Sequence, residues 1–323
     1  MLKTDRKEHF IHMAQHRTGR RISNTVNGHA LESLPFAYAR QSIACERHPE
    51  RNEDSLIVDE RSGLVAVFDG VGGSAAGEIA SQTAARAALN AWKQEIQRVQ
   101  KRRKVPTYFD SSDDIDLPTI LQQLIEDADK LVRTEGAQRA GTDDLATTVA
   151  LAAFSRDSSS RSYTMTFAHV GDSRIYLLRK NEALKRLTND DGLLARLVDN
   201  QIISDEDALR IDQAMQASDL SDIEFSYFRL RGGITQALGS PLAPTIHINQ
   251  VAIYPGDRIL LCTDGIHDNL IDTEIEDILR RSVRSSAARL LVERALERSH
   301  EERETTIRAK PDDITAIVVT CCF

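Results

Sequence analysis

Residues 64–73 read LVAVFDGVGG, an uninterrupted apolar run that stops at an aspartate followed by glycine. Such a run indicates a short buried β-strand, and Asp69-Gly70 marks the position at which that strand ends. Residues 259–265, ILLCTDG, repeat the pattern and stop at Asp264. Both aspartates therefore lie at the mouth of a predicted buried strand, and the glycine after each leaves its backbone carbonyl accessible.

Further carboxylates border other predicted strands. Asp172 lies between two of them, and the pairs Glu53-Asp54 and Asp312-Asp313 each precede one. A single Asp-Gly is a common turn, but clustered carboxylates repel one another and become neutral unless a cation compensates their charge. Because these ligands are all oxygens, we expect Mg²⁺ or Mn²⁺ rather than zinc.

The predicted elements indicate an α+β fold. Helical patterns occupy 76–100 with 118–138, and 273–283 with 286–303, as pairs between runs of strands. Paired helices favour antiparallel sheets covered by helices over a doubly wound parallel sheet. The nine predicted strands are 36–44, 55–58, 63–68, 147–154, 163–170, 174–179, 247–253, 258–263 and 314–322.

The composition is typical of a globular protein without a membrane span. Of the 323 residues, 41% are hydrophobic and 28% are charged, and no apolar run approaches the ~20 residues of a transmembrane helix. The net charge of −8 argues against a nucleic-acid partner, whose affinity would require a basic surface. The four cysteines lack C-x-x-C spacing, so we expect a reduced, cytoplasmic compartment.

The chain divides into a basic N-terminal arm, residues 1–34, and one catalytic domain, residues 35–323. Residues 1–30 carry six Lys and Arg against Asp5 and Glu8, and they lack the apolar stretch of a secretory signal. A solvated terminus and a docking or targeting segment both fit the arm.

Eight stretches resemble, in order, the motif set of the type 2C, metal-dependent Ser/Thr phosphatase family. The resemblance spans about 36–320, and Val71 stands where animal members carry a histidine, so the bacterial members are the most similar. The stretches are RNEDSLIV (51–58), VAVFDGVGG (65–73), ATTVALA (146–152), AHVGDSRIYLL (168–178), LTNDDGLLARLV (187–198), ITQALGS (234–240), GDRILLCTDGI (256–266) and KPDDITAIVV (310–319).

The resemblance implies a central β-sandwich of two antiparallel sheets flanked by helix pairs, with two Mg²⁺ or Mn²⁺ ions at one end. A hydroxide bridging the ions would attack the phosphoryl group. The implied roles are as follows: Asp69 bridges both ions, the Gly70 carbonyl binds one, Asp264 and Asp312 complete the other, Glu53 acts through a bound water, Asp172 with Asp264 holds a third ion, and Asp54 and Asp313 support the ligands.

Two departures from the family pattern concern phosphate binding and charge. Pro49 stands where members commonly carry a phosphate-binding arginine, so we expect Arg51, then Arg47, to take this role, a solvated arginine being the alternative for either. Asp313 stands where the family usually has asparagine. The added negative charge could tighten metal binding or weaken binding of the phosphoprotein, and the sequence does not decide between them.

Residues 189–233 are a long, mostly polar connection, which in a compact domain is more often a functional flap than a structural element. Compared with typical bacterial members, the chain adds about AMQASDLSDIEFSYFRLRGG, residues 214–233. The mixture of acids with Phe225, Tyr227, Arg229 and Arg231 is typical of a surface that grips a peptide. A loop that only packs against the domain is the equal alternative.

The sequence therefore predicts a hydrolase that removes phosphate from phosphoserine and phosphothreonine in the protein substrates of a Ser/Thr kinase, acting as a monomer. One alternative is a catalytically weak, phosphatase-like regulator that binds a phosphoprotein, which loss of the metal-binding carboxylates would mark. A hydrolase of small phosphoesters is the other.

Overall fold

The computed structural model describes residues 34–71, 76–103, 109–110, 116–157, 162–302 and 304–323. The arm predicted at 1–34 lies outside this part of the chain except for Leu34. That side chain is 4% exposed and packs in the core between the sheets. The described body therefore begins at the last residue assigned to the arm.

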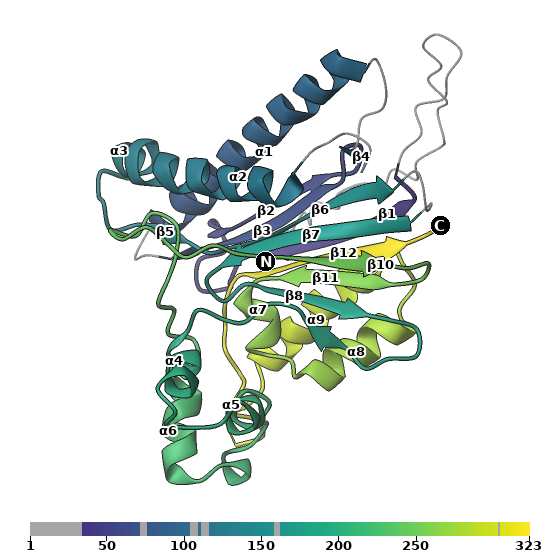
Figure 1. The fold of residues 1–323 in the computed structure, drawn as a ribbon. Helices are drawn as coiled ribbons and strands as arrows, with labels where there is room; N and C mark the ends of the chain where they lie inside the picture. Colours follow the sequence, from purple (N-terminus) through teal and green to yellow (C-terminus); the bar gives the residue numbers. More distant parts are fainter. Residues whose placement is uncertain (1–33, 72–75, 104–108, 111–115, 158–161, 303) are drawn as a thin grey trace, which may run out of the picture. The chain divides into compact units, whose positions relative to one another are not determined.

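Two antiparallel sheets lie face to face in the described body (Figure 1). One sheet has the order β1 (Phe36–Ile43), β12 (Ile314–Cys321), β11 (Arg258–Cys262), β8 (Arg174–Leu178) and β9 (Lys185–Arg186). The other has the order β10 (His247–Ile253), β7 (Ser162–Val170), β6 (Val149–Asp157), β3 (Leu64–Val71) and β2 (Asp54–Asp59). Two short strands join this second sheet: β4 (Phe109–Asp110) pairs in parallel with β6, and β5 (Ala146–Thr147) pairs with β3. The predicted α+β class is confirmed.

Residues 64–68 of strand β3 are all apolar because both faces of the strand are buried there. Val65 and Val67 face the other sheet, whereas Leu64, Ala66 and Phe68 face the helices. Side chains alternate between the two faces of a strand, so a strand covered on both sides needs apolar residues at every position. The unbroken apolar run in the sequence therefore indicates that β3 lies in the centre of the fold, covered on both faces.

Helices cover the outer face of each sheet as pairs, as predicted (Figure 1). The outer face of the β3 sheet carries α1 (Ala76–Arg103) and α2 (Leu117–Leu131), which continues into a π-helical segment, η2 (Val132–Gly136), and α3 (Ala137–Ala140). The β12 sheet carries α8 (Asp272–Arg281) and α9 (Ala287–Ser299). Pro118 lies in the first turn of α2, where its missing N–H costs nothing. None of the helices in the described residues is long and apolar enough to cross a membrane.

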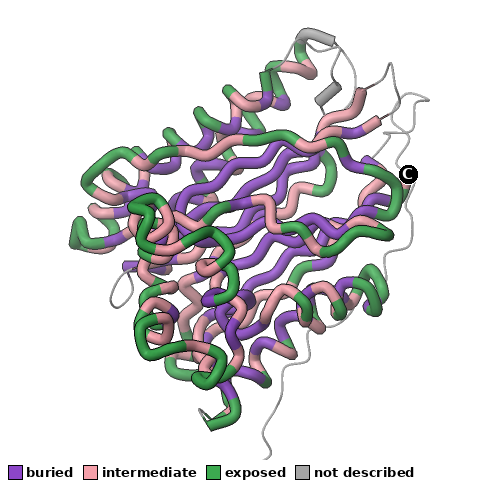
Figure 2. The backbone as a smooth tube through the Cα atoms, turned by 60° about the horizontal axis from the view of Figure 1, so that its bottom comes forward, coloured by how far each residue is buried: buried purple, intermediate pink, exposed green. Residues whose placement is uncertain are grey.

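The predicted flap, residues 189–233, folds into short helices at one end of the sandwich (Figure 1). They are α4 (Leu193–Asp199), α5 (Asp205–Asp212), η3 (Ala217–Asp219) and α6 (Asp222–Leu230). Ser221 and Glu224 form a capping box that starts α6, and Ile211, Ala214 and Phe228 give the flap a small core of its own. Figure 2 shows the contrast between the buried strands and the largely exposed or half-buried flap.

Candidate active site

Asp69 lies within β3 rather than after it. Its register partner is Asp54 on β2, and the strand continues through Gly70 and Val71 because the short strand β5 supplies partners for both. The predicted end at residue 68 is therefore wrong by three residues. The Asp69 carbonyl accepts hydrogen bonds from Thr147 Oγ1, at 2.9 Å, and from the Thr148 amide, at 2.8 Å. These bonds fix the backbone from which the carboxylate projects.

Gly70 allows three segments to meet at this end of the sandwich. A Cβ atom at residue 70 would lie 2.2 Å from the Gly77 carbonyl oxygen on α1 and 2.6 Å from that of Glu53. The Gly70 amide donates to the Glu53 carbonyl at 3.1 Å. Any side chain at residue 70 would push α1 and the Glu53 segment apart, so glycine is required here by close packing.

A second group of carboxylates forms where β11 ends and β12 begins. Asp264 opens the single turn α7 (Asp264–His267), directly after β11. A Cβ atom at Gly265 would lie 2.1 Å from the Asp313 carbonyl oxygen, so the loop before β12 packs closely on this turn. This contact brings Asp312 to the same place as Asp264, as their predicted shared role requires.

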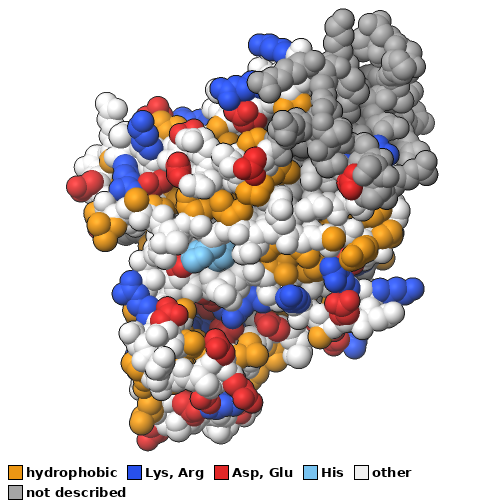
Figure 3. Space-filling view, in the orientation of Figure 1, with side chains coloured by type: hydrophobic (Ala, Val, Ile, Leu, Met, Phe, Trp, Pro, Cys, Tyr) orange, Lys and Arg blue, Asp and Glu red, His pale blue; other side chains and the backbone are white. Residues whose placement is uncertain are grey.

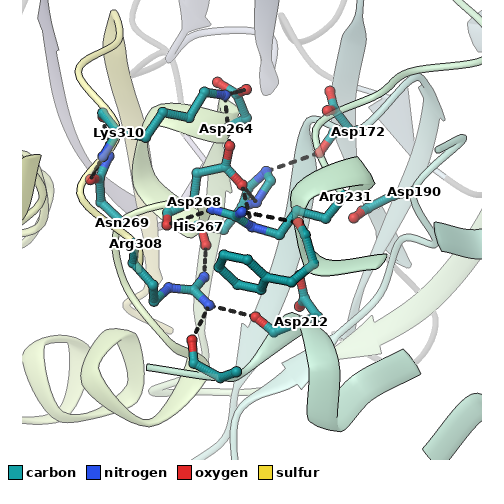
Figure 4. Close-up of polar contacts among 12 residues, drawn as sticks. Asp172, Asp190, Asp212, Arg231, Asp264, His267, Asp268, Asn269, Arg308 and Lys310 are labelled. Carbon is teal, nitrogen blue, oxygen red and sulfur yellow. Dashed lines mark hydrogen bonds and ion pairs between the residues drawn. The ribbon is translucent and has the colours of Figure 1, made fainter. Parts of the chain in front are cut away.

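Sequence reasoning missed Asp268 and Lys310, which both belong to this group. The Lys310 Nζ atom lies 2.5 Å from Asp264 Oδ2 and 2.6 Å from Asp268 Oδ2, and Figure 4 shows these three residues together. The same atom lies 3.1 Å from Asp312 Oδ2. The signal was present in the spacing, because Asp268 follows Asp264 by about one helical turn and Lys310 precedes Asp312 by two residues. We refer to Asp69, Asp172, Asp264, Asp268 and Asp312 as the acid cluster.

Three members of the acid cluster, Asp69, Asp172 and Asp312, resist ionisation when no added cation is present. Burial raises the pKa of the Asp69 carboxyl, and the carboxylates of Asp264, Asp54, Asp172 and Asp312 raise it further. Burial and then Asp264 raise the pKa of Asp172 in the same way. The pKa of Asp312 rises to about 7, again through burial first and Asp264 second, against the opposing effect of Lys310. These shifts are the physical mark of a site that needs positive charge.

The donor set fits a hard divalent cation. Among the described residues, no group of three or more Asp, Glu, His or Cys side chains has the arrangement of a formed metal site. The ammonium group of Lys310 lies instead among three carboxylate oxygens and is a stand-in cation. A position that encloses an ammonium group with carboxylate oxygens alone has the chemistry that Mg²⁺ and Mn²⁺ prefer.

Of the two predicted phosphate-binding arginines, one contacts the site. Arg51 Nε lies 3.2 Å from Glu53 Oε1, and the pKa of the Glu53 carboxyl is raised by burial and lowered in part by Arg51. Arg47 is exposed on the loop between β1 and β2. The phosphate-binding role of Arg51 stays a prediction, but this side chain is anchored beside a predicted site carboxylate.

Asp313 and Asp54 hold backbone and hydroxyl groups around the site. Asp313 Oδ1 accepts from the Cys45 amide at 2.6 Å, and its Oδ2 accepts from the Glu53 amide at 2.7 Å. Asparagine has one acceptor oxygen on its side chain, so aspartate is the residue that serves both amides with separate oxygens. Asp54 Oδ2 accepts from Thr263 Oγ1 at 2.8 Å, next to Asp264.

The base of the flap is tied to the acid cluster by charged side chains (Figure 4). Arg231 Nε lies 3.3 Å from Asp268 Oδ1, and its guanidinium lies 3.8 Å from the centre of the Phe228 ring. Arg308 is fully buried and donates to the backbone carbonyls of Asp212, in the flap, and of His267, in α7. The flap is thus joined to the residues that follow Asp264.

The predicted substrate-binding residues of the flap have different surroundings. Phe225 and Tyr227 are half-buried and pack on the flap core, Arg229 is exposed, and Arg231 faces Asp268. Their role in gripping a peptide stays a prediction, since the packing of the two aromatic rings is internal to the flap. Figure 3 shows apolar side chains exposed among charged ones in this region. Five of the eight exposed large apolar residues of the described chain lie in the flap, namely Leu193, Ile202, Leu209, Ile223 and Leu230.

Two other polar groups near the site have structural roles. Cys262 is fully buried in β11, and burial raises the pKa of its thiol far above the ordinary value, which disfavours the thiolate needed for nucleophilic attack. The His267 ring is also buried, and its Nε2 lies 3.1 Å from the Asp172 carbonyl oxygen. Burial lowers the pKa of His267 to about 4.

Comparison with known proteins identifies relatives of this arrangement. The family model for protein phosphatase 2C matches residues 44–303. The serine/threonine phosphatase stp of Listeria monocytogenes is 26% identical over 266 residues, which are 82% of this chain and 91% of that protein.

Two solved structures extend the similarity to the fold. The Mycobacterium tuberculosis serine/threonine phosphatase PstP/Ppp matches with a TM-score of 0.65 and 26% identity, over 90% of this chain and 100% of that one. The catalytic domain of the serine/threonine protein phosphatase PstP, in complex with two manganese ions, matches with a TM-score of 0.61 and 26% identity, over 89% and 99% of the two chains.

Proposed function

This chain belongs to the protein phosphatase 2C family and is a protein serine/threonine phosphatase, and from this premise we propose that its acid cluster binds two divalent ions that serve phosphoester hydrolysis. The observation that carries the proposal is the enclosure of a cation, the Lys310 ammonium, by carboxylate oxygens at the end of the sandwich. The two manganese ions in the related PstP structure support it.

The proposed ligands are the strand-end residues. Asp69 would be shared by both ions, the Gly70 carbonyl would serve one, and Asp264 with Asp312 would serve the other. Asp172 with Asp264 is the proposed position of a third ion. When bound, the ions would lower the pKa of a shared water so that hydroxide is present at neutral pH, and they would neutralise charge on the phosphoryl oxygens.

The protein's own side chains orient this chemistry. The Glu53 carbonyl accepts a hydrogen bond from the amide of Gly70, the residue after Asp69, and we propose that the Glu53 carboxylate accepts a hydrogen bond from water. Arg51, anchored by Glu53, supplies a planar guanidinium for the phosphate. Asp313 fixes the Glu53 backbone and so keeps both side chains in position, as a rigid supporting contact is expected to do.

We assign the substrate surface to the flap. A phosphoprotein presents apolar and charged side chains around the phosphorylated residue. The flap exposes apolar residues such as Ile202, Leu209 and Ile223, and its base is joined to the acid cluster through Arg231 and Asp268. A small phosphoester has no neighbouring side chains that could bind to such a surface. We therefore propose that the substrates are phosphoserine and phosphothreonine residues in the protein targets of a Ser/Thr kinase.

Turnover of p-nitrophenyl phosphate and of a phosphothreonine peptide, each with and without Mn²⁺, tests the proposal. We expect both activities to vanish in EDTA, to return with Mn²⁺ or Mg²⁺, and to survive thiol alkylation. Full turnover of EDTA-treated protein would refute the metal mechanism. Tight, metal-dependent binding of the phosphopeptide without turnover would instead favour the phosphoprotein-binding regulator.

A further inference from the structure

Lys310 occupies a position that the proposed metal chemistry leaves unexplained. Its Nζ atom is 2.5 Å from Asp264 Oδ2 and 3.1 Å from Asp312 Oδ2, and these are the two carboxylates proposed to complete one ion site. An inference about Lys310 therefore rests on the proposed function. A positive side chain among the ligands of a cation is unexpected, because like charges repel at this range.

The backbone of Lys310 is held in place by hydrogen bonds to the side chain of Asn269. The Asn269 side chain, which is fully buried, accepts from the Lys310 amide at 3.1 Å and donates to the Lys310 carbonyl at 2.9 Å. The same Asn269 side chain also donates to the Gly265 carbonyl in α7 at 2.9 Å. The lysine is thus fixed on both sides to the turn that carries Asp264. This clamp distinguishes it from a surface lysine that reaches a carboxylate by chance.

We propose that Lys310 is a tethered cation that neutralises Asp264 and Asp312 while no divalent ion is bound there, and that it thereby weakens the binding of that ion. An incoming ion must either displace the ammonium group from both carboxylates or bind beside it. Each route costs free energy, since the first breaks two ion pairs and the second places like charges within a few ångströms.

Asp268 can keep its ion pair with the ammonium group after a metal ion displaces that group from Asp264 and Asp312. Its Oδ2 is 2.6 Å from Lys310 Nζ, and Asp268 is not among the proposed ligands. Lys310 can therefore release Asp264 and Asp312 and keep one ion pair. The competition then alters the affinity for metal without preventing binding. Because the Lys310 side chain is 37% exposed, solvent screens part of the repulsion, and we expect an effect of about tenfold rather than many orders of magnitude.

Isothermal titration of metal-free protein with Mn²⁺ tests this role without measuring activity. Lys310→Met removes the charge and keeps most of the length, and Lys310→Arg keeps the charge. Lys93→Met, an exposed position on α1, is the matched control. We expect Lys310→Met to bind Mn²⁺ at least about tenfold more tightly than the wild type, and Lys310→Arg and Lys93→Met to stay within about threefold of it.

Urea unfolding in EDTA supplies a second readout. Without the ammonium group the acid cluster repels itself, so Lys310→Met should unfold at lower urea than Lys93→Met and recover when Mn²⁺ is added. If Lys310→Met does not fold without metal, each protein is loaded with Mn²⁺ while folded, and release into excess EDTA is timed. Slower release from Lys310→Met is then the expected result.

The possible results test the proposed role of Lys310 and the proposed metal site separately. Equal or weaker Mn²⁺ binding by Lys310→Met would overturn the role of Lys310 and leave the metal site standing. Binding by Lys310→Arg as tight as by Lys310→Met would show that shape rather than charge matters, which also overturns it. Absence of Mn²⁺ binding in both wild type and Lys310→Met would remove the proposed metal site and the inference together.

Discussion

Arg231, the last charged residue of the flap, forms an ion pair with Asp268, four residues after Asp264, with 3.3 Å between Arg231 Nε and Asp268 Oδ1. Burial opposes ionisation of Asp268, but Lys310 and then Arg231 lower the pKa of its carboxyl far below the ordinary value. The Asp268 carboxylate is therefore charged and is shared between the flap and the segment that carries Asp312. This side chain, together with the hydrogen bonds of Arg308, holds the flap against the acid cluster.

Replacing Arg231 should loosen the flap without unfolding the sandwich. Arg231→Met keeps an apolar stem over Phe228 but removes the flap's ion pair with Asp268, so the flap loses an anchor at its base. We expect faster amide hydrogen exchange in α5 and α6, unchanged exchange in β3 and β11, and a lower kcat/KM for a phosphoprotein. Arg229→Met, at an exposed neighbouring position, is the control. Equal exchange in the two variants would contradict this anchoring role.

Removing single charges from the acid cluster should abolish turnover while preserving the fold. Asp69→Asn and Asp264→Asn each remove a proposed ligand, and we expect turnover to fall at least ~10²-fold. Because burial and its neighbours already raise the pKa of Asp69, Asp69→Asn should not destabilise the metal-free protein. Kinetic assays paired with urea unfolding in EDTA check both statements. Near-normal turnover in both variants would refute the assigned ligands.

In the metal-free protein, the free energy of unfolding should decrease as the pH rises. Burial raises the pKa values of Asp54, Asp69 and Asp172, and that of Asp312 rises to about 7. A carboxyl whose pKa is higher in the folded state binds more protons when folded. Its stabilising effect is present at low pH and is lost as the pH rises through the folded pKa. Each such group changes the free energy of unfolding by about 1.4 kcal/mol per pH unit at most.

The window for this test lies above about pH 6.5. At lower pH the buried rings of His169 and His267 act in the opposite direction, since burial lowers their pKa values and stability then rises with pH. We therefore expect the urea midpoint in EDTA to fall between about pH 6.5 and 8, and saturating Mn²⁺ to remove the slope. A midpoint in EDTA that is flat or rises across this window would contradict the prediction.

Asp313→Asn should be destabilising, although asparagine is the usual residue of the family at this position. One of the amides of Cys45 and Glu53 would lose its acceptor, because the asparagine side chain offers a single oxygen. The cost of a buried charge-assisted hydrogen bond is about 2 kcal/mol. Urea unfolding measures it, with Asp272→Asn at the start of α8 as a comparison aspartate. An unchanged free energy of unfolding would contradict the two-amide role.

Polar substitutions on the flap surface should lower activity on a phosphoprotein and leave activity on a small phosphoester unchanged. Ile202→Ser, Leu209→Ser and Ile223→Ser change side chains that are 56%, 49% and 64% exposed, so little stability is at risk. We expect a lower kcat/KM for a phosphoprotein and unchanged turnover of p-nitrophenyl phosphate. Val283→Ser, 67% exposed after α8, is the control. Deletion of residues 214–231 is a poorer test, because Phe228 fills the flap core and the Met215 carbonyl accepts from Ile307.

The sequence by itself determined the sandwich and most of the proposed ligands. Periodicity is a local property, so the run 64–68, buried on both faces, and the paired amphipathic helices could be recognised without any long-range information. Aspartates followed by glycine at strand ends marked Asp69 and Asp264 in the same way. The extension of β3 to Val71 was missed because it depends on pairing with β5 from residues 146–147, and the two-residue strands β4 and β9 were missed because they are too short to show a pattern.

Only the tertiary structure decided how charges from distant segments meet. Lys310 is joined to Asp264 and Asp268 across more than forty residues, and Asp313 reaches the Glu53 amide across 260. Nothing in the local pattern states that a lysine will lie among acids or that an aspartate will serve two amides. These contacts arise because β11 and β12 pair and β1 packs beside them, which brings separate loops to one end of the sandwich.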